Sequence, residues 1–118
     1  MIQIKLDLFE IQSAAHLGIL RCLESIKHNE NWGYNYKGSL SQKFAHSISG
    51  SCAEAAVAKY LNIKFPYTCN HGSEPDLIYK DKKLQIRSQT KKIKNKNSLI
   101  IRPNAKKDEF YIYVQDEA

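Results

Sequence analysis

The stretch EPDLIYKDKKLQIRSQ, residues 74–89, predicts a β-hairpin that organises the rest of the chain. Two runs rich in apolar residues, 76–80 and 84–89, are separated by a short polar turn. Because successive side chains of a strand point to opposite faces, Gln85 and Arg87 share one face of the second strand. The first run opens on an acid, so the hairpin gathers a carboxylate, an amide and a guanidinium within a short length of chain.

Two helices are expected before the hairpin. Apolar residues recur at helical spacing over 8–28, and Asp7 with Glu10 has the pattern of a capping box. A second helix is expected from Ser41 or Gln42 to about residue 62. Most of its faces are apolar or small, which is typical of a buried helix. Glu54 lies within it, and a buried carboxylate needs a partner.

The remaining strands are expected at 98–102 and 109–115, with residues 2–6 as a further edge strand. Two helices followed by consecutive strands predict an α/β fold in which two N-terminal helices pack on a small mixed, mainly antiparallel sheet. The length favours one domain over residues 1–118.

Composition narrows the class of protein. The chain has 118 residues, of which 42% are hydrophobic, and this suits a folded domain. Apolar runs are shorter than the roughly 18 residues of a membrane span. The first residues, MIQIKLDLFE, lack the order of a signal peptide. We therefore expect a cytoplasmic protein without a membrane partner, and three irregularly spaced cysteines do not indicate a disulfide framework.

Charge is distributed unevenly. Residues 80–107 hold 11 of the 18 Lys and Arg residues and one acid, a net charge of +10, whereas the other residues hold seven against 11 acids, a net charge of −4. This asymmetry predicts a polyanionic partner, nucleic acid first, with an acidic protein as the alternative. The candidate nucleic-acid contacts are His46, Lys82, Lys83, Lys91, Lys92, Lys94, Lys96 and Arg102.

Glu54, Asp76, Gln85 and Arg87 form the candidate catalytic site. If the second helix packs on the Gln85 and Arg87 face, these side chains surround one pocket. Oxygen ligands of this kind suit Mg²⁺ or Mn²⁺. Asp76 would be the central ligand, with the Gln85 side chain, the Ile86 carbonyl and Glu54, directly or through water, as the others. Arg87 would stabilise negative charge on a phosphate.

Competing interpretations are weaker or structural. Each acid taken alone also suits an ordinary surface or turn position. Cys52, Cys69 and His71 lack the spacing of a zinc site. A Cys52–His46 nucleophile pair would be separated by about 9 Å along one helix, which opposes a hydrogen bond. Aromatic residues in the loop 29–40 either stack on bases or cover an edge of the core.

The order of these residues resembles the motif of the PD-(D/E)xK nuclease superfamily. That motif has a helix glutamate, a Pro-Asp pair opening a strand, and acid-x-Lys on the next strand. Here it reads Glu54, Pro75-Asp76 and Gln85-Ile86-Arg87, with a nine-residue gap between Asp76 and Gln85. Gln in place of the acid also occurs in Mrr-like restriction enzymes. The resemblance implies a restriction-endonuclease-like core and Mg²⁺-dependent cleavage of DNA.

Nearly the whole chain is also similar to a family of small bacteriophage proteins. That similarity implies that Gln-x-Arg is a family feature, that the location is the host cytoplasm, and that DNA is favoured over RNA. It also raises a homodimer, because phage nucleases of this fold are often dimers. The motifs that carry it are GILR at 18–21, His46 with Gly50 and Glu54, AVAKYL at 56–61, QIRSQ at 85–89, LIIRP at 99–103 and FYIYV at 110–114.

Two functions remain open at this point. Arginine stays protonated and cannot serve as a base, and glutamine adds no negative charge, so weaker Mg²⁺ binding is expected than at a three-acid site. The first function is a Mg²⁺-dependent phage nuclease with a variant site. The second is a weak or inactive nuclease-fold protein that binds nucleic acid or a host protein through residues 80–107.

Overall fold

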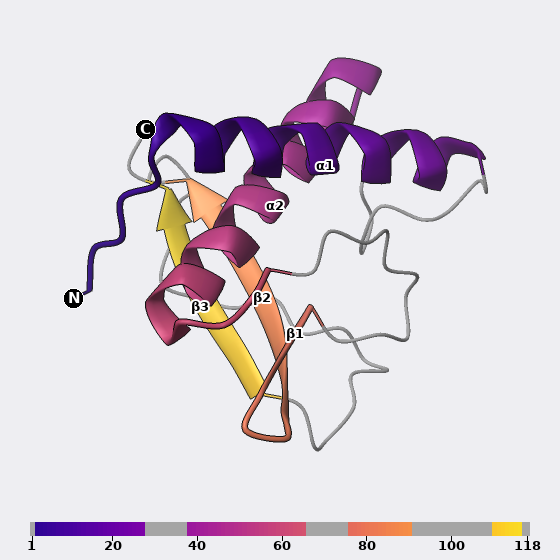
Figure 1. The fold of residues 1–118 in the computed structure, drawn as a ribbon. Coiled ribbons are helices and arrows are strands. Elements are labelled where there is room, and N and C mark those ends of the chain that lie inside the picture. The colour runs from indigo at the N-terminus through magenta and orange to yellow at the C-terminus, as the bar shows by residue number, and fades with distance from the viewer. Residues whose placement is uncertain (1, 28–37, 66–75, 91–109, 117–118) are drawn as a thin grey trace.

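The computed structural model describes residues 2–27, 38–65, 76–90 and 110–116. Within these ranges the chain forms two helices and a three-stranded mixed sheet (Figure 1), which confirms the expected α/β class with two N-terminal helices. The elements are α1 (Leu8–Lys27), α2 (Leu40–Leu61), β1 (Leu77–Tyr79), β2 (Lys82–Thr90) and β3 (Phe110–Asp116).

Both helices begin with a capping box. Before α1, the Asp7 N–H donates to Glu10 Oε1 and the Glu10 N–H donates to Asp7 Oδ1, each at 2.8 Å. Before α2, Ser39 and Gln42 make the same reciprocal pair, so the helix starts slightly earlier than its apolar pattern predicts. Asn62 ends α2 in the left-handed conformation, which asparagine tolerates well.

The two helices touch through their backbones at Gly18. A Cβ at that position would lie 2.7 Å from Ile48 Cα and 2.9 Å from the Ser47 carbonyl oxygen, both in α2. Only glycine allows so close an approach. Ala14 and Cys22, one turn to either side on α1, are fully buried at this crossing.

Strand β2 is the centre of the sheet. It pairs antiparallel with β1, with Leu77 opposite Leu84, and parallel with β3, with Leu84 opposite Phe110. Lys80 and Asp81 form the tight turn between β1 and β2, and both have positive φ, as a two-residue hairpin turn requires.

The expectation of a mainly antiparallel sheet is therefore wrong for the described strands, because one pair is antiparallel and the other is parallel. A parallel pair needs a long connection, and residues 91–109 are long enough to supply it. Residues 2–6 are not a strand. The strand expected at 98–102 lies outside the described residues.

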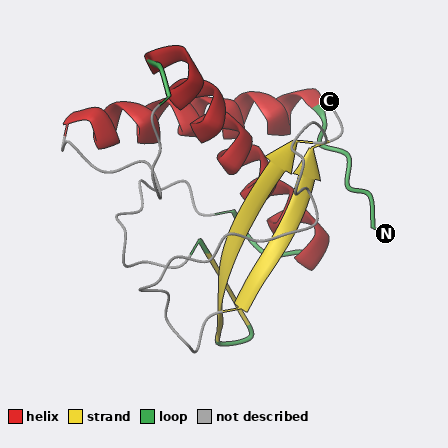
Figure 2. Ribbon diagram, turned by 180° about the vertical axis from the view of Figure 1, so that it is seen from behind, coloured by secondary structure: helices red, strands yellow, loops and turns green. Residues whose placement is uncertain are grey.

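The molecule has a helical layer and a sheet layer. Seen from behind, β2 and β3 are covered by neither helix, because α2 lies on the other face of the sheet and α1 packs on α2 beyond the strand ends (Figure 2). That covered face carries Leu84 and Ile86, which are buried in one core cluster with Ala53 and Val57 of α2. The helix was expected on the opposite face. Burial of apolar side chains decides the packing, because Leu84 and Ile86 offer the larger apolar surface.

Gly18 on α1 and Gly50 on α2 allow a matched test of the helix crossing. Gly18→Ala should lower the free energy of unfolding by about 1–3 kcal/mol, because its methyl group collides with backbone. Gly50→Ala should raise it by up to about 1 kcal/mol, because its Cβ meets nothing within 4 Å and alanine favours the helix. Urea unfolding of both variants measures the difference. Equal effects would contradict this account of the crossing.

Candidate functional site

Glu54 is a buried acid on α2, with only 8% of its surface exposed. Its Oε1 lies 2.8 Å from Arg21 Nη1, in a salt bridge between the two helices. Arg21 follows Gly18 by three residues, so both lie on the face of α1 that meets α2. The close helix approach at Gly18 therefore lets Arg21 reach the carboxylate.

The electrostatic surroundings of Glu54 include both predicted charged partners. Burial is the main reason that the pKa of Glu54 is raised to about 7, and the negative charge of Asp76 is the second. The positive charges of Arg21 and Arg87 oppose this rise in pKa. Two carboxylates and two guanidinium groups thus lie close enough to influence one another.

Asp76 stands immediately before β1 and is held by the backbone of β2. Its N–H donates to the Leu84 carbonyl at 3.0 Å, which continues the antiparallel pairing by one residue. Its Oδ2 accepts the Ile86 N–H at 2.6 Å. The hairpin therefore fixes the Asp76 carboxylate against β2 at the point where β1 begins.

Arg87 directs one guanidinium nitrogen toward a group of oxygens. Arg87 Nη1 lies 3.2 Å from the Ile86 carbonyl oxygen, 3.5 Å from Gln85 Oε1 and 3.8 Å from Asp76 Oδ2. The guanidinium carbon also lies 5.3 Å from the ring centroid of Tyr111 on β3, a cation–π contact. The Arg87 side chain is about one-third exposed, at 34%.

The structure thus brings the four predicted site residues into one region. Glu54 comes from α2, Asp76 from the start of β1, and Gln85 and Arg87 from β2. Asp76 and Arg87 lie close enough to Glu54 to influence its pKa, although α2 covers the face of β2 opposite the one expected. The chemical roles assigned to these residues remain predictions.

Arg21 is the residue that sequence reasoning left out of the site. It lies 33 positions before Glu54, and no periodic pattern links the two. Two signals were present in the sequence. A buried acid requires a cation or a donor, and Gly18 and Arg21 are the ends of the GILR element.

The predicted nucleic-acid contacts are only partly described. Lys82 and Lys83 are exposed on the hairpin, and Lys82 Nζ lies 5.3 Å from the ring centroid of Phe110. His46 is exposed on α2, two turns before Glu54 and about 12 Å from it along the helix axis. Residues that lie outside the description are Lys91, Lys92, Lys94, Lys96 and Arg102, and with them Cys69, His71, Trp32, Tyr34 and Tyr36.

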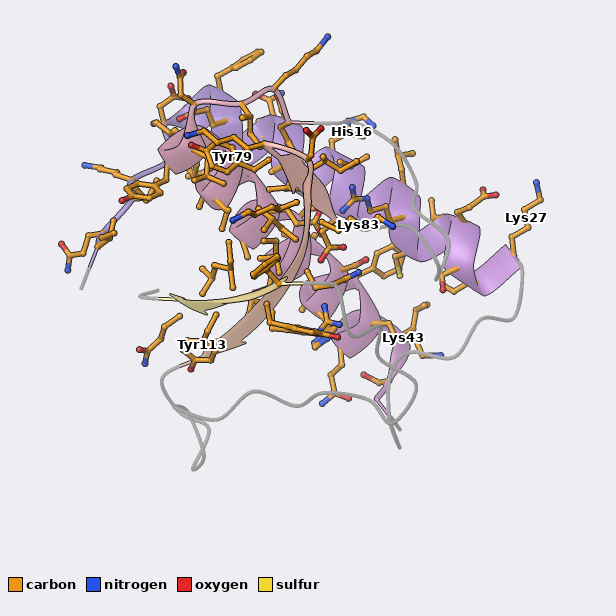
Figure 3. All side chains as sticks on the ribbon, turned by 90° about the horizontal axis from the view of Figure 1, so that it is seen from below. His16, Lys27, Lys43, Tyr79, Lys83 and Tyr113 are labelled. Carbon is orange, nitrogen blue, oxygen red and sulfur yellow. The ribbon has the colours of Figure 1, made fainter. Side chains whose placement is uncertain are left out.

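Side chains at the outer parts of the molecule point away from one another. Figure 3 shows Lys27 extending from the far end of α1, away from the sheet. Tyr113 of β3 points away from the helices in the same view, in agreement with the burial of its neighbours Ile112 and Val114 against the core on the other face. Lys82 and Lys83 share β2 with Gln85 and Arg87, whereas Lys43 and Lys59 share α2 with Glu54.

The oxygen atoms of the site suit a hard divalent cation. In the part of the chain that the structure describes, no three His, Cys, Asp or Glu residues are grouped as a metal site. Glu54 and Asp76 provide two carboxylates, and the other donors are the Gln85 amide and the Ile86 carbonyl. Mg²⁺ is commonly held by one or two carboxylates with water and phosphate, so this donor set fits it.

Comparisons with known proteins add no assignment. No protein-family model, curated protein or solved structure gives a significant match to this chain. Within the described ranges, neither helix combines the length and the apolar character that crossing a bilayer requires. We therefore infer the function from the geometry of the site and from its charges.

The raised pKa of Glu54 predicts how stability varies with pH. The folded state holds the Glu54 proton up to a pKa of about 7, against an ordinary 4.5, so unfolding of the metal-free protein becomes easier as the pH rises from 4.5 through 7. The loss should be at most about 3 kcal/mol, and Glu54→Gln should remove it.

Urea unfolding at pH 5, 6, 7 and 8 in a chelator measures this slope. Glu10→Gln is the matched control, because Glu10 is exposed and its pKa is lowered, chiefly by its hydrogen bond with Lys59. The control should keep the wild-type slope. Identical slopes in wild type and Glu54→Gln would show that Glu54 does not hold its proton in this range.

Proposed function

We propose that this protein is a divalent-metal-dependent nuclease that cleaves DNA phosphodiester bonds at Glu54, Asp76, Gln85 and Arg87. The observation that carries the proposal is the placement of a buried helix glutamate beside an aspartate held by the edge of β2. A buried acid with a second acid nearby is costly in a purely structural role. Such pairs are common where a protein binds a cation or transfers a proton.

The donor atoms support Mg²⁺ or Mn²⁺ as the cofactor. Asp76 is the central ligand in this proposal, because its carboxylate is already oriented by the Ile86 N–H. Glu54, the Gln85 amide oxygen and the Ile86 carbonyl complete the protein ligands. A bound ion of this class supplies a Lewis acid for a phosphodiester and a water of lowered pKa.

The two arginines have different tasks in the proposed site. Arg87 stands at the exposed side, where its guanidinium can bind a phosphate and stabilise the charge that develops on it. Arg21 is largely buried and acts through Glu54, so it is a positioning residue. Neither serves as a base, since arginine does not lose its proton in proteins.

The hairpin supports nucleic acid as the substrate. Lys80, Lys82 and Lys83 are exposed on the hairpin that carries Asp76, Gln85 and Arg87, and they begin the segment 80–107 with its net charge of +10. Contacts of this kind hold a phosphate backbone electrostatically. We further propose that the helices and mixed sheet form a restriction-endonuclease-like core acting on DNA in a host cytoplasm. Its support is the spatial grouping of the motif residues.

Gln85 and Arg87 differ from the acid and lysine of the nuclease motif, and this difference favours a second function. A site with two acids and a permanently charged arginine is poorer in metal ligands than a three-acid site. Among the described residues, Arg87 stands where the nuclease motif has a lysine, and arginine cannot act as a base. The alternative is thus a protein of the same fold that binds nucleic acid, or a host protein, without cleaving a bond.

Cleavage assays separate the two functions. Plasmid, single-stranded and branched DNA should be cut by wild type in Mg²⁺ or Mn²⁺. Asp76→Asn should cut at least about 100-fold more slowly, because it loses the charge that binds the metal. Gel assays of product against time measure both rates.

Asp81→Asn is the matched control, because Asp81 is an exposed acid in the hairpin turn. This variant should cut DNA at the wild-type rate. Undiminished cleavage by Asp76→Asn would refute the proposed site. If wild type cuts none of the substrates yet binds DNA with a strong salt dependence that Asp76→Asn shares, the second function holds.

A further inference from the structure

The three oxygens assigned to a metal converge on a nitrogen of the protein itself. Ile86 O, Gln85 Oε1 and Asp76 Oδ2 lie 3.2, 3.5 and 3.8 Å from the same atom, Arg87 Nη1. One oxygen is a backbone carbonyl, one an amide and one a carboxylate. All three are acceptors, and the cationic nitrogen fills the space that they share.

We propose that the Arg87 guanidinium occupies the cation position of this site, and that a divalent ion enters only after a phosphate group has drawn Arg87 out. The inference rests on the proposed function, because it concerns the same metal site. In this proposal the Arg87 side chain determines the order of binding, with nucleic acid first and the metal second. The protein without nucleic acid would then bind divalent ions weakly.

Electrostatic repulsion is the reason that the two cations exclude each other. A divalent ion bound to Asp76 Oδ2 would stand within a few ångströms of Arg87 Nη1, which lies 3.8 Å from that oxygen. Repulsion between charges at such a distance is strong where solvent is partly excluded. The same three oxygens cannot serve both cations at once.

A phosphate is the ligand best suited to move Arg87. Guanidinium binds phosphate through two parallel hydrogen bonds, whereas its contact with Asp76 is long and single. The side chain is one-third exposed, and the Tyr111 ring lies beside it, on the strand face opposite the core-facing Ile112 and Val114. Arg87 can therefore turn outward while its guanidinium stays near an aromatic face.

Glu54 does not depend on Arg87 for its charge partner. Its salt bridge is with Arg21, at 2.8 Å. Withdrawal of Arg87 therefore leaves Glu54 paired and takes one cation away from the Asp76, Gln85 and Ile86 oxygens together. Arg21 therefore pairs with Glu54, whereas Arg87 occupies the metal position.

The test measures Mn²⁺ binding in the absence of nucleic acid, by electron paramagnetic resonance of free Mn²⁺. Arg87→Met removes the charge and keeps an unbranched side chain that can lie against Tyr111. It should bind Mn²⁺ at least about tenfold more tightly than wild type. Arg87→Gln serves as a second variant and should show the same direction.

Lys83→Met is the matched control. It removes one positive charge from the same strand, two residues before Gln85, but Lys83 is exposed on the hairpin. It should change Mn²⁺ affinity by less than about threefold, because exposed charges are well screened. Adding Asp76→Asn to Arg87→Met should abolish the gain, which places the bound ion at Asp76.

A second measurement tests the role of phosphate. Duplex DNA with cleavage-resistant phosphorothioate linkages should raise the Mn²⁺ affinity of wild type and leave that of Arg87→Met nearly unchanged. Mn²⁺ held by the DNA itself appears equally with both proteins. A rise of the same size in both would refute the gating by phosphate.

Failure of this inference can be told apart from failure of the nuclease proposal. Mn²⁺ binding by Arg87→Met that is no tighter than wild type, or absent from both, overturns the inference whatever the cleavage result. Tighter binding by Arg87→Met together with no cleavage by wild type supports the arginine as occupant of the metal position and removes the catalytic claim alone.

Discussion

The salt bridge between Arg21 and Glu54 is the interaction on which the rest of the structure depends. A carboxylate with 8% of its surface exposed cannot stay in a helix interface without a cation or a proton. The cation arrives only because the helices touch at Gly18, where a methyl group would strike backbone. Helix packing therefore determines the contact between Arg21 and Glu54, and a substitution at the crossing should disturb that contact.

Glu54 and the three charged groups around it have a net charge of zero when all are ionised. Two carboxylates face two guanidinium groups when Glu54 is ionised, so the protein alone satisfies its own site. A divalent ion would add a charge of +2 to this set, and departure of one arginine would lower the excess to +1. Arg21 is held in the helix interface, whereas Arg87 stands at the exposed side, so Arg87 is the arginine that can leave.

The local features of this fold could be read from the sequence, and the relations between distant segments could not. The capping-box pair of Asp7 and Glu10 predicts the start of α1, and the residue pattern of 76–90 predicts the hairpin. Alternation separated the Gln85 face from the Leu84 face, but the apolar side chains chose which one α2 covers. The direction of β3 depends on the connection before it. The grouping of Glu54 and Asp76 was predicted from a motif, whereas Arg21 was missed because its partner lies 33 positions away.

The position of β2 at the centre of the sheet has a consequence for a chain still being synthesised. Its partner on one side, β1, is made just before it, while its partner on the other side, β3, is made only after residues 91–109. Until β3 leaves the ribosome, one edge of β2 presents unpaired backbone groups that can template a strand from another molecule. The nascent protein is thus most prone to intermolecular association late in translation, and a chaperone that covers this edge would act there.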